Sequence, residues 1–196
     1  MPPENNQIID IKPEETSTGS FFLEIIKFTL ISILIVAPIR FFIAQPFIVR
    51  GESMDPTYSD GQYLIIDELT YRREAPARGD VVVFKYPKDL SKYFIKRIIG
   101  LPNETVEIKN GIPTIFSSEN PKGKTLNEPY LKDLSFENIS SQKLGPDEYF
   151  VMGDNRSNSL DSRIWGPLPK KNITGRVLVR LFPFKSAGFF PGKQTE

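Results

Sequence analysis

The serine at position 53 is a candidate nucleophile in a chain that lacks the usual catalytic base. It lies in Gly-Glu-Ser-Met-Asp-Pro-Thr, residues 51–57, and the chain contains no histidine and no cysteine. A serine hydroxyl would therefore have to give its proton to a carboxylate, to the amino terminus, or to a lysine kept neutral by burial. Because a serine beside a proline-containing turn is most often a turn or cap residue, its chemistry depends on what the rest of the chain supplies.

Lys96 is the lysine best suited to be that base. It lies in Tyr-Phe-Ile-Lys-Arg-Ile-Ile-Gly, residues 93–100, among apolar neighbours that predict a core strand. Lysine normally titrates near about 10.4, and burial in an apolar strand can bring that pKa close to neutrality. The same residues also fit a lysine on the solvent face of an edge strand, with Arg97 turned inward to an ion pair. The strand alone leaves both interpretations open.

A third polar stretch, Gly-Asp-Asn-Arg-Ser-Asn-Ser-Leu-Asp-Ser-Arg at 153–163, precedes the only tryptophan, Trp165. One interpretation is a surface loop. The other is a partly buried support, in which Asp161 pairs with Arg163 and a serine hydroxyl holds an amine. The stretch lacks the acidic third and fifth positions and the sixth-position glycine of a calcium loop. Without histidine or cysteine, a catalytic metal would have to rest on carboxylates alone, so we expect no metal and no other cofactor.

The composition sets the class of protein. The chain has 196 residues, of which 39% are apolar, with 25 basic and 24 acidic side chains. This length allows one main domain and an insertion. The balanced charge argues against a nucleic-acid partner. The absence of cysteine excludes a disulfide framework but does not fix the redox compartment.

Short segments rich in β-branched and aromatic residues predict the strands that would position these groups. They are bounded by turn residues and lie at 63–67, 80–86, 93–100, 105–108, 148–152 and 175–181. No strong amphipathic helix intervenes, so we expect a mostly β protein with an antiparallel core. That core would comprise residues 43–108 and 147–190, with a smaller β-rich subdomain inserted at 109–146 and a tail at 191–196.

The residues before these strands predict a membrane anchor. Residues 1–20 are polar and read as a disordered tail, whereas 21–42 supply roughly the twenty apolar residues that a transmembrane helix needs. A cleaved signal peptide fits poorly, because a polar acidic leader comes first and no clear A-x-A site follows. A buried core helix remains open. The acidic leader gives the positive-inside rule no support for a cytoplasmic amino terminus.

The segments together resemble the type I signal peptidases, or leader peptidases, which are membrane-bound serine proteases that remove leader sequences from exported proteins. Four segments match the family's motifs in the family's order: Ser-Met-Asp-Pro-Thr at 53–57, Arg-Gly-Asp-Val-Val-Val-Phe at 78–84, Lys-Arg-Ile-Ile-Gly-Leu-Pro at 96–102, and the stretch 153–163. Each motif is weak alone, but their combination is specific.

The resemblance implies that Ser53 attacks the scissile carbonyl and that Lys96 takes its proton and returns it to the leaving amine. The backbone N–H of Ser53 would be one oxyanion donor. A serine two positions before the nucleophile supplies a second donor in some family members. That position is Gly51 here, so a second donor must come from elsewhere.

The same resemblance assigns supporting and substrate-binding positions. Ser159 matches the hydroxyl that orients the lysine, and Asp161 and Arg163 match the pair that supports the site. Five residues match the positions that line shallow pockets for the small residues of an A-x-A site: Phe47, Val49, Met54, Val83 and Ile95. Ile95 is the least secure of these, because neighbouring residues in a strand point to opposite faces.

The resemblance also implies the partners and the location. The partners would be preprotein signal peptides and a lipid bilayer, and the protein would be a single-pass membrane protein with its catalytic domain on the extracytoplasmic side. Two alternatives remain open. A self-cleaving repressor of the SOS-response type also uses serine and lysine, but it would carry a DNA-binding domain in place of an anchor. A membrane-tethered β-domain could bind peptides or partners with both residues inert.

Overall fold

The computed structural model describes residues 18–42, 44–131 and 138–192, which divide between Ile39 and Arg40 into two units. The described part of the first unit is helix α1, Thr18–Phe42, except for its last three residues, which belong to the second unit. The helix includes the last three residues of the predicted polar tail, 18–20, and residues 1–17 of that tail lie outside the described part of the chain.

Helix α1 carries exposed apolar side chains along residues 21–36. They include Phe22 at 59%, Phe28 at 68% and Leu34 at 74% exposure. No helix within the described residues is long and apolar enough to cross a membrane. The anchor at 21–42 therefore stays a prediction.

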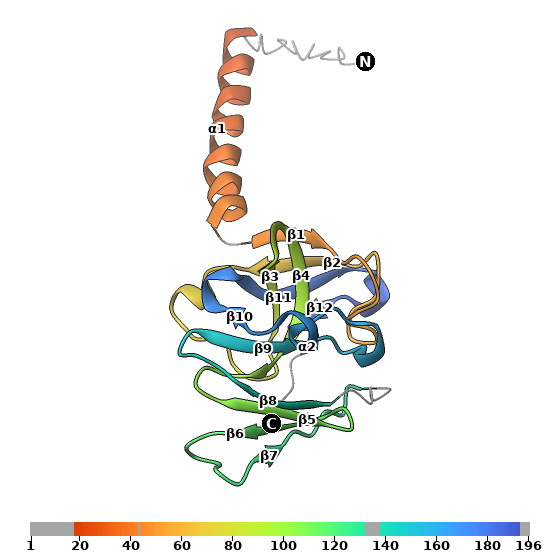
Figure 1. Cartoon of the computed structure of the whole chain (residues 1–196). Helices are drawn as coiled ribbons and strands as arrows, with labels where there is room; N and C mark the ends of the chain where they lie inside the picture. Colours follow the sequence, from red (N-terminus) through yellow and green to blue (C-terminus); the bar gives the residue numbers. More distant parts are fainter. Residues whose placement is uncertain (1–17, 43, 132–137, 193–196) are drawn as a thin grey trace, which may run out of the picture. The chain divides into compact units, whose positions relative to one another are not determined.

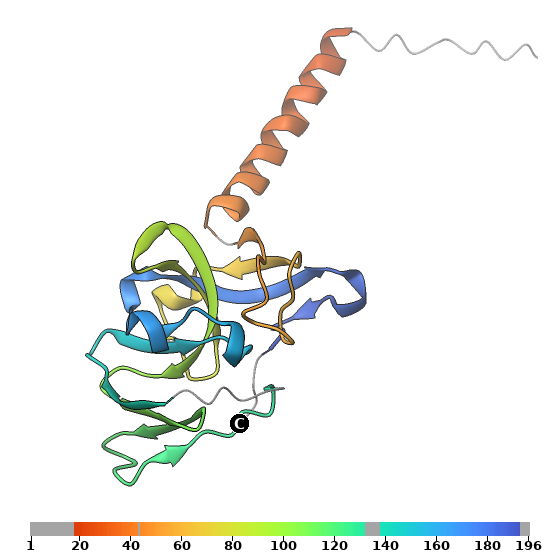
Figure 2. The same cartoon turned by 45° about the vertical axis from the view of Figure 1, so that its right-hand side comes forward.

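The second unit is built on an antiparallel sheet, as the strand pattern predicts (Figures 1 and 2). Seven strands follow one another across it in the order β1 (Ala44–Ile48), β2 (Tyr63–Asp67), β11 (Ile173–Phe182), β3 (Val81–Tyr86), β4 (Asp89–Gly100), β9 (Glu148–Met152) and β10 (Leu168–Pro169). The two-residue strand β12 (Gly188–Phe189) pairs with β11. β11, near the end of the chain, thus lies between β2 and β3.

Apolar residues on both faces of β3 explain why this sheet has two cores. Val81 and Val83 face one cluster, which also contains Leu64 and Ile66. Val82 and Phe84 face a second cluster, whose other members include Ile98, Val151, Trp165 and Leu168. Because successive side chains of a strand alternate between faces, the continuous Val-Val-Val-Phe run of β3 must be covered on both sides.

The residues between β4 and β9 form a smaller sheet (Figure 1). Its strands lie in the order β7 (Lys124–Thr125), β6 (Ile112–Phe116), β5 (Thr105–Lys109) and β8 (Ile139–Lys143). The prediction that segment 105–108 belongs to the main core is wrong. β5 forms a hairpin with β6 through Asn110 and Gly111, which both have positive φ, and this hairpin places β5 in the small sheet.

Short helical turns complete the fold. They are η1 (Thr70–Arg72), η2 (Arg156–Asn158), α2 (Ser162–Trp165), η3 (Lys170–Asn172) and η4 (Phe184–Ser186). η2 lies within the polar stretch 153–163, and α2 begins in it and ends two residues beyond it. Asp161 caps α2, because its side chain accepts a hydrogen bond from the Arg163 N–H. The polar stretch is therefore ordered by its own side chains.

Candidate active site

Ser53 and Lys96 meet in the structure, although 43 positions separate them in the sequence. Ser53 lies in the turn between β1 and β2, and Lys96 lies in β4. Lys96 Nζ is 2.6 Å from Ser53 Oγ and also donates a hydrogen bond to the Ile95 carbonyl oxygen at 2.9 Å. This is the contact that a lysine base needs with a serine nucleophile.

Lys96 is buried, with an exposure of 4%. Burial lowers the pKa of its amine to about 8, while the nearby Asp161 and Asp154 carboxylates act in the opposite direction. The interpretation of Lys96 as an exposed residue on an edge strand is wrong, because β4 lies between β3 and β9. The other half of that interpretation, an inward Arg97, is right.

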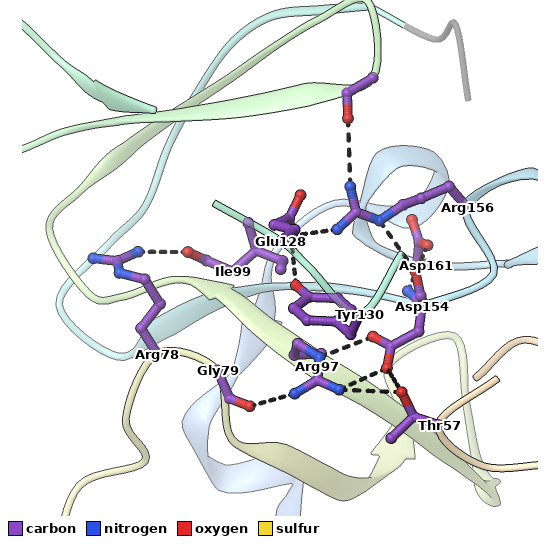
Figure 3. Close-up of polar contacts among 12 residues, drawn as sticks. Thr57, Arg78, Gly79, Arg97, Ile99, Glu128, Tyr130, Asp154, Arg156 and Asp161 are labelled. Atoms are coloured by element: carbon purple, nitrogen blue, oxygen red, sulfur yellow. Dashed lines mark hydrogen bonds and ion pairs between the residues drawn. The ribbon is translucent and has the colours of Figure 1, made fainter. Parts of the chain in front are cut away.

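Arg97, the residue after the lysine, forms a fully buried ion pair with Asp154 (Figure 3). Its Nη2 is 2.6 Å and its Nε 2.9 Å from the two carboxylate oxygens, which is a bidentate arrangement. Asp154 also accepts a hydrogen bond from the Thr57 hydroxyl at 2.5 Å. Asp154 therefore joins the strand of the base to the turn of the nucleophile.

Asp161 and Arg163 form the predicted pair. Arg163 Nε is 2.8 Å from Asp161 Oδ1, and Asp161 is fully buried. The second carboxylate oxygen of Asp161 accepts a hydrogen bond from the Gly153 N–H at 3.0 Å. The pair thus fixes the backbone at Gly153, where any side chain would collide with Ser159 Oγ and with the Ser53 carbonyl oxygen.

Ser159 lies against this backbone, and its buried Oγ makes no hydrogen bond within the described residues. The contact between its hydroxyl and the lysine stays a prediction. In contrast, the Ser53 carbonyl oxygen is held directly by the polar stretch, because it accepts a hydrogen bond from the Asn155 N–H at 3.1 Å.

A cleft of about 770 Å³ opens beside Ser53 and Lys96. Four of the five predicted pocket residues line it: Phe47, Val49, Val83 and Ile95. Met54, the fifth, is 1% exposed and packs in the core cluster beneath the cleft. Sequence reasoning missed several lining residues, among them Leu64, Tyr93 and Leu160. The Tyr93 ring lies 5.3 Å from that of Phe47, so an aromatic pair joins β1 to β4 across the cleft.

Ile95 and Lys96 both reach the cleft, although they leave the strand on opposite faces. Ile95 pairs with Val83 across the β3–β4 ladder, and Lys96 pairs with Val82, without an irregularity at these positions. The Lys96 amine contacts the carbonyl of the preceding residue. The lysine side chain therefore bends back along its own strand, and this brings the amine to the cleft without a bulge.

The turn around Ser53 contains a backbone N–H, that of Ser53 itself, which is available to donate a hydrogen bond to an oxyanion. The Ser53 N–H makes no hydrogen bond to any other described residue, whereas the Gly51 N–H donates to Asp60 Oδ1 at 2.7 Å. Gly51 has φ +84°, a conformation that favours glycine, and the space where a side chain would start is open. Among the described residues, no group of acidic side chains could hold a metal ion.

Comparison with known proteins matches residues 22–182 to the family described as signal peptidase, peptidase S26. The chain belongs to this family. Among the relatives of the peptidase, probable signal peptidase I-1 of Synechocystis sp. is 37% identical over 174 residues, 85% of this chain and 86% of the relative. Signal peptidase I P of Bacillus subtilis subsp. natto is 36% identical over 181 residues, 87% of this chain and 94% of the relative.

A solved structure also resembles part of the peptidase. It is a signal peptidase I from Enterococcus faecalis, with 29% identity, a TM-score of 0.45, and coverage of 53% of this chain and 97% of that chain. The family match and the relatives together make the chain a signal peptidase I, a hydrolase of the serine protease class.

Proposed function

We propose that the peptidase cleaves its substrates with Ser53 as the nucleophile and Lys96 as the general base. One observation carries this assignment: the buried Lys96 amine lies 2.6 Å from Ser53 Oγ at the wall of an apolar cleft. With a pKa of about 8, about one lysine in ten is neutral at pH 7 and able to accept a proton.

In this mechanism the neutral Lys96 amine accepts the hydroxyl proton while Ser53 Oγ bonds to the scissile carbonyl carbon. The Ser53 N–H stabilises the oxyanion of the tetrahedral intermediate. The resulting Lys96 ammonium then gives its proton to the departing amine, which leaves an acyl-enzyme. Water, activated by the same lysine, hydrolyses the ester and releases Ser53.

The ion pairs around this dyad keep the lysine available as a base. Asp154 and Asp161 both raise the pKa of Lys96, and each carboxylate is paired with a guanidinium, Arg97 or Arg163. These pairs offset much of the negative charge that would otherwise hold the proton on the amine. Asp161 and Arg163 would support the site in this way, and Ser159 would orient the amine.

The substrates would be preproteins with small residues at the third and first positions before the cut. Phe47, Val49, Val83 and Ile95 form apolar walls of the cleft, with Met54 packed beneath it. Such walls exclude large side chains by steric clash. The segment 21–42 would anchor the enzyme in a bilayer, with the catalytic unit on the extracytoplasmic side.

Cleavage of a purified preprotein with an A-x-A site tests this assignment. We expect the wild type to cut directly after the second small residue and Ser53→Ala and Lys96→Ala to be inactive. Retained cutting by Lys96→Ala at a comparable rate would refute the base. A wild type that binds the peptide without cutting it would favour the alternative of a peptide-binding β-domain.

A further inference from the structure

Two side chains of the small sheet's long connection reach the catalytic half of the molecule. They are Glu128 and Tyr130, which lie between β7 and β8. The Glu128 carboxylate forms an ion pair with Arg156, and the side chains are only 6% and 1% exposed. The Tyr130 hydroxyl donates to the same carboxylate at 2.5 Å. Figure 3 shows both residues between the arginines of the catalytic half.

The Arg156 side chain links Glu128 to the backbone that holds Ser53. Its Nε donates to the Gly153 carbonyl oxygen at 3.2 Å, and its Nη1 lies 3.4 Å from the Gly111 carbonyl oxygen in the small sheet. The Arg156 carbonyl oxygen accepts a hydrogen bond from Arg163 at 2.7 Å. Asn155, which directly precedes Arg156, donates to the Ser53 carbonyl oxygen. Glu128 is thus linked to the nucleophile through its ion pair with Arg156, the peptide bond to Asn155, and the hydrogen bond from Asn155 to Ser53.

Tyr130 provides a second link, to the residue after the base. Its ring centre lies 4.0 Å from the Arg97 guanidinium carbon, a close cation–π contact. Arg97 in turn holds Asp154, which holds Thr57 in the nucleophile's turn. Both links therefore start from the same carboxylate and end on the turn that carries Ser53.

We propose that Glu128 is a positioning residue of the peptidase. It acts through Arg156 on the backbone that holds Ser53. With Tyr130, it also keeps the Arg97 guanidinium and its partner Asp154 directed toward the turn that carries Ser53. This inference rests on the proposed roles of Ser53 and Lys96. The connection between β7 and β8 thus has a part in catalysis, because its side chains lie outside the cleft and fix the positions of the reacting groups within it.

A purely stabilising role does not explain these contacts well. A buried ion pair is weak support for stability, because well-packed apolar side chains of similar volume stabilise as much or more. What apolar side chains cannot do is direct the donors of Arg156 toward the Gly153 carbonyl oxygen. An effect that depends on this direction should alter the reaction more than it alters folding.

The experiment compares four variants of the full-length protein in detergent on an A-x-A peptide. Glu128→Ala removes the carboxylate, and Glu128→Gln keeps a hydrogen-bond acceptor. The double variant Glu128→Leu/Arg156→Met replaces the pair by apolar side chains. The matched control is Glu107→Ala, which breaks the more exposed ion pair of Glu107 with Lys109 in the same small sheet.

Each variant is measured by kcat, KM, the thermal midpoint, and the ratio of affinities for a peptide aldehyde and the matching peptide alcohol. Ser53 Oγ can add to the aldehyde carbon, and the hydroxyl proton ends on the new hemiacetal oxygen. The alcohol only occupies the cleft. A smaller fraction of folded protein lowers the apparent kcat, but it leaves this affinity ratio unchanged, so the ratio reports the geometry of the reacting groups.

We expect Glu128→Ala to lower kcat on the order of 10- to 100-fold with little change in KM, and to reduce the aldehyde preference by a similar factor. Glu128→Gln should keep most of the activity and Glu107→Ala all of it. The double variant Glu128→Leu/Arg156→Met should have the thermal midpoint of the wild type but not its kcat. If Glu128→Ala does not fold, the kcat and the affinity ratio of Glu128→Gln and of the double variant decide whether the proposal stands.

Three results would overturn the proposal: a folded Glu128→Ala with normal kcat, an apolar pair that recovers kcat together with the thermal midpoint, or a lower kcat with an unchanged aldehyde preference. Failure of the proposed function looks different, because the wild type itself would then leave the peptide uncut. In that case both proposals fall.

Discussion

Burial of the Lys96 amine should make the peptidase less stable than a variant without it. The perturbation is Lys96→Met, which keeps an unbranched apolar chain in the same place and removes the charge. A fall in the lysine pKa from 10.5 to about 8 corresponds to about 3 kcal/mol of unfavourable free energy for holding the protonated amine in the folded state. We expect Lys96→Met to be inactive and more stable than the wild type by up to about 3 kcal/mol at pH 7.

The pH dependence gives this prediction its sign. Because the folded-state pKa lies below the unfolded-state pKa, the unfolded chain binds more protons between about pH 8 and pH 10.5. Wild-type stability should therefore rise with pH across this window. The advantage of Lys96→Met is complete below about pH 8 and disappears near pH 10.5.

Urea unfolding followed by tryptophan fluorescence is the assay, since Trp165 is the only tryptophan and packs in a core cluster of the catalytic unit. Lys85→Met is the matched control, because Lys85 is exposed on the neighbouring strand β3 and its replacement should change stability by less than about 0.5 kcal/mol. If Lys96→Met is less stable than the wild type, or if the stability difference does not change between pH 7 and pH 10.5, then burial of the protonated amine does not destabilise the folded protein.

Three further predictions concern the reaction itself. The pH profile of kcat/KM should have its acidic limb centred near 8, the value to which burial lowers the pKa of Lys96, and a limb near 10.5 would contradict the assignment. Gly153→Ala should lower kcat by on the order of 100-fold in a folded protein, because the new methyl group would displace the Ser53 carbonyl or Ser159; near-normal turnover would contradict this. Val83→Ala should raise cleavage after valine relative to alanine by about tenfold in competition assays, because it widens the cleft, and an unchanged ratio would mean that Val83 does not set the pocket.

Local patterns were sufficient to predict the short apolar strands that directly follow clear turn residues. The expected bounds of 63–67 and 148–152 coincide with β2 and β9. β1 was missed because Ala-Gln-Pro-Phe-Ile contains Pro46, which is tolerated there because β1 forms the edge of the sheet. The extension of β4 back to Asp89 was missed because its first residues are polar and exposed.

Residues of the site could be predicted from the sequence only where they occupy a position of a family motif. Ser53, Lys96 and the Asp161–Arg163 pair were found in this way, and all of them lie around one cleft or directly behind it. The sequence allowed an inward Arg97 in an ion pair, but the partners in the Arg97–Asp154 and Glu128–Arg156 pairs could not be predicted, because each pair joins side chains far apart in sequence. An arginine is expected at the surface, and only the fold shows which carboxylate makes its burial possible.

The place of β11 in the sheet determines when the enzyme can become active during synthesis. β2, which follows the nucleophile's turn, and β3, which pairs with the strand of the base, are not neighbours; both hydrogen bond to β11 (Ile173–Phe182). Until the ribosome has delivered β11, the serine and the lysine have no common sheet to bring them together. We therefore expect a nascent chain that ends before β11 to contain Ser53 and Lys96 and still to be unable to cleave a peptide.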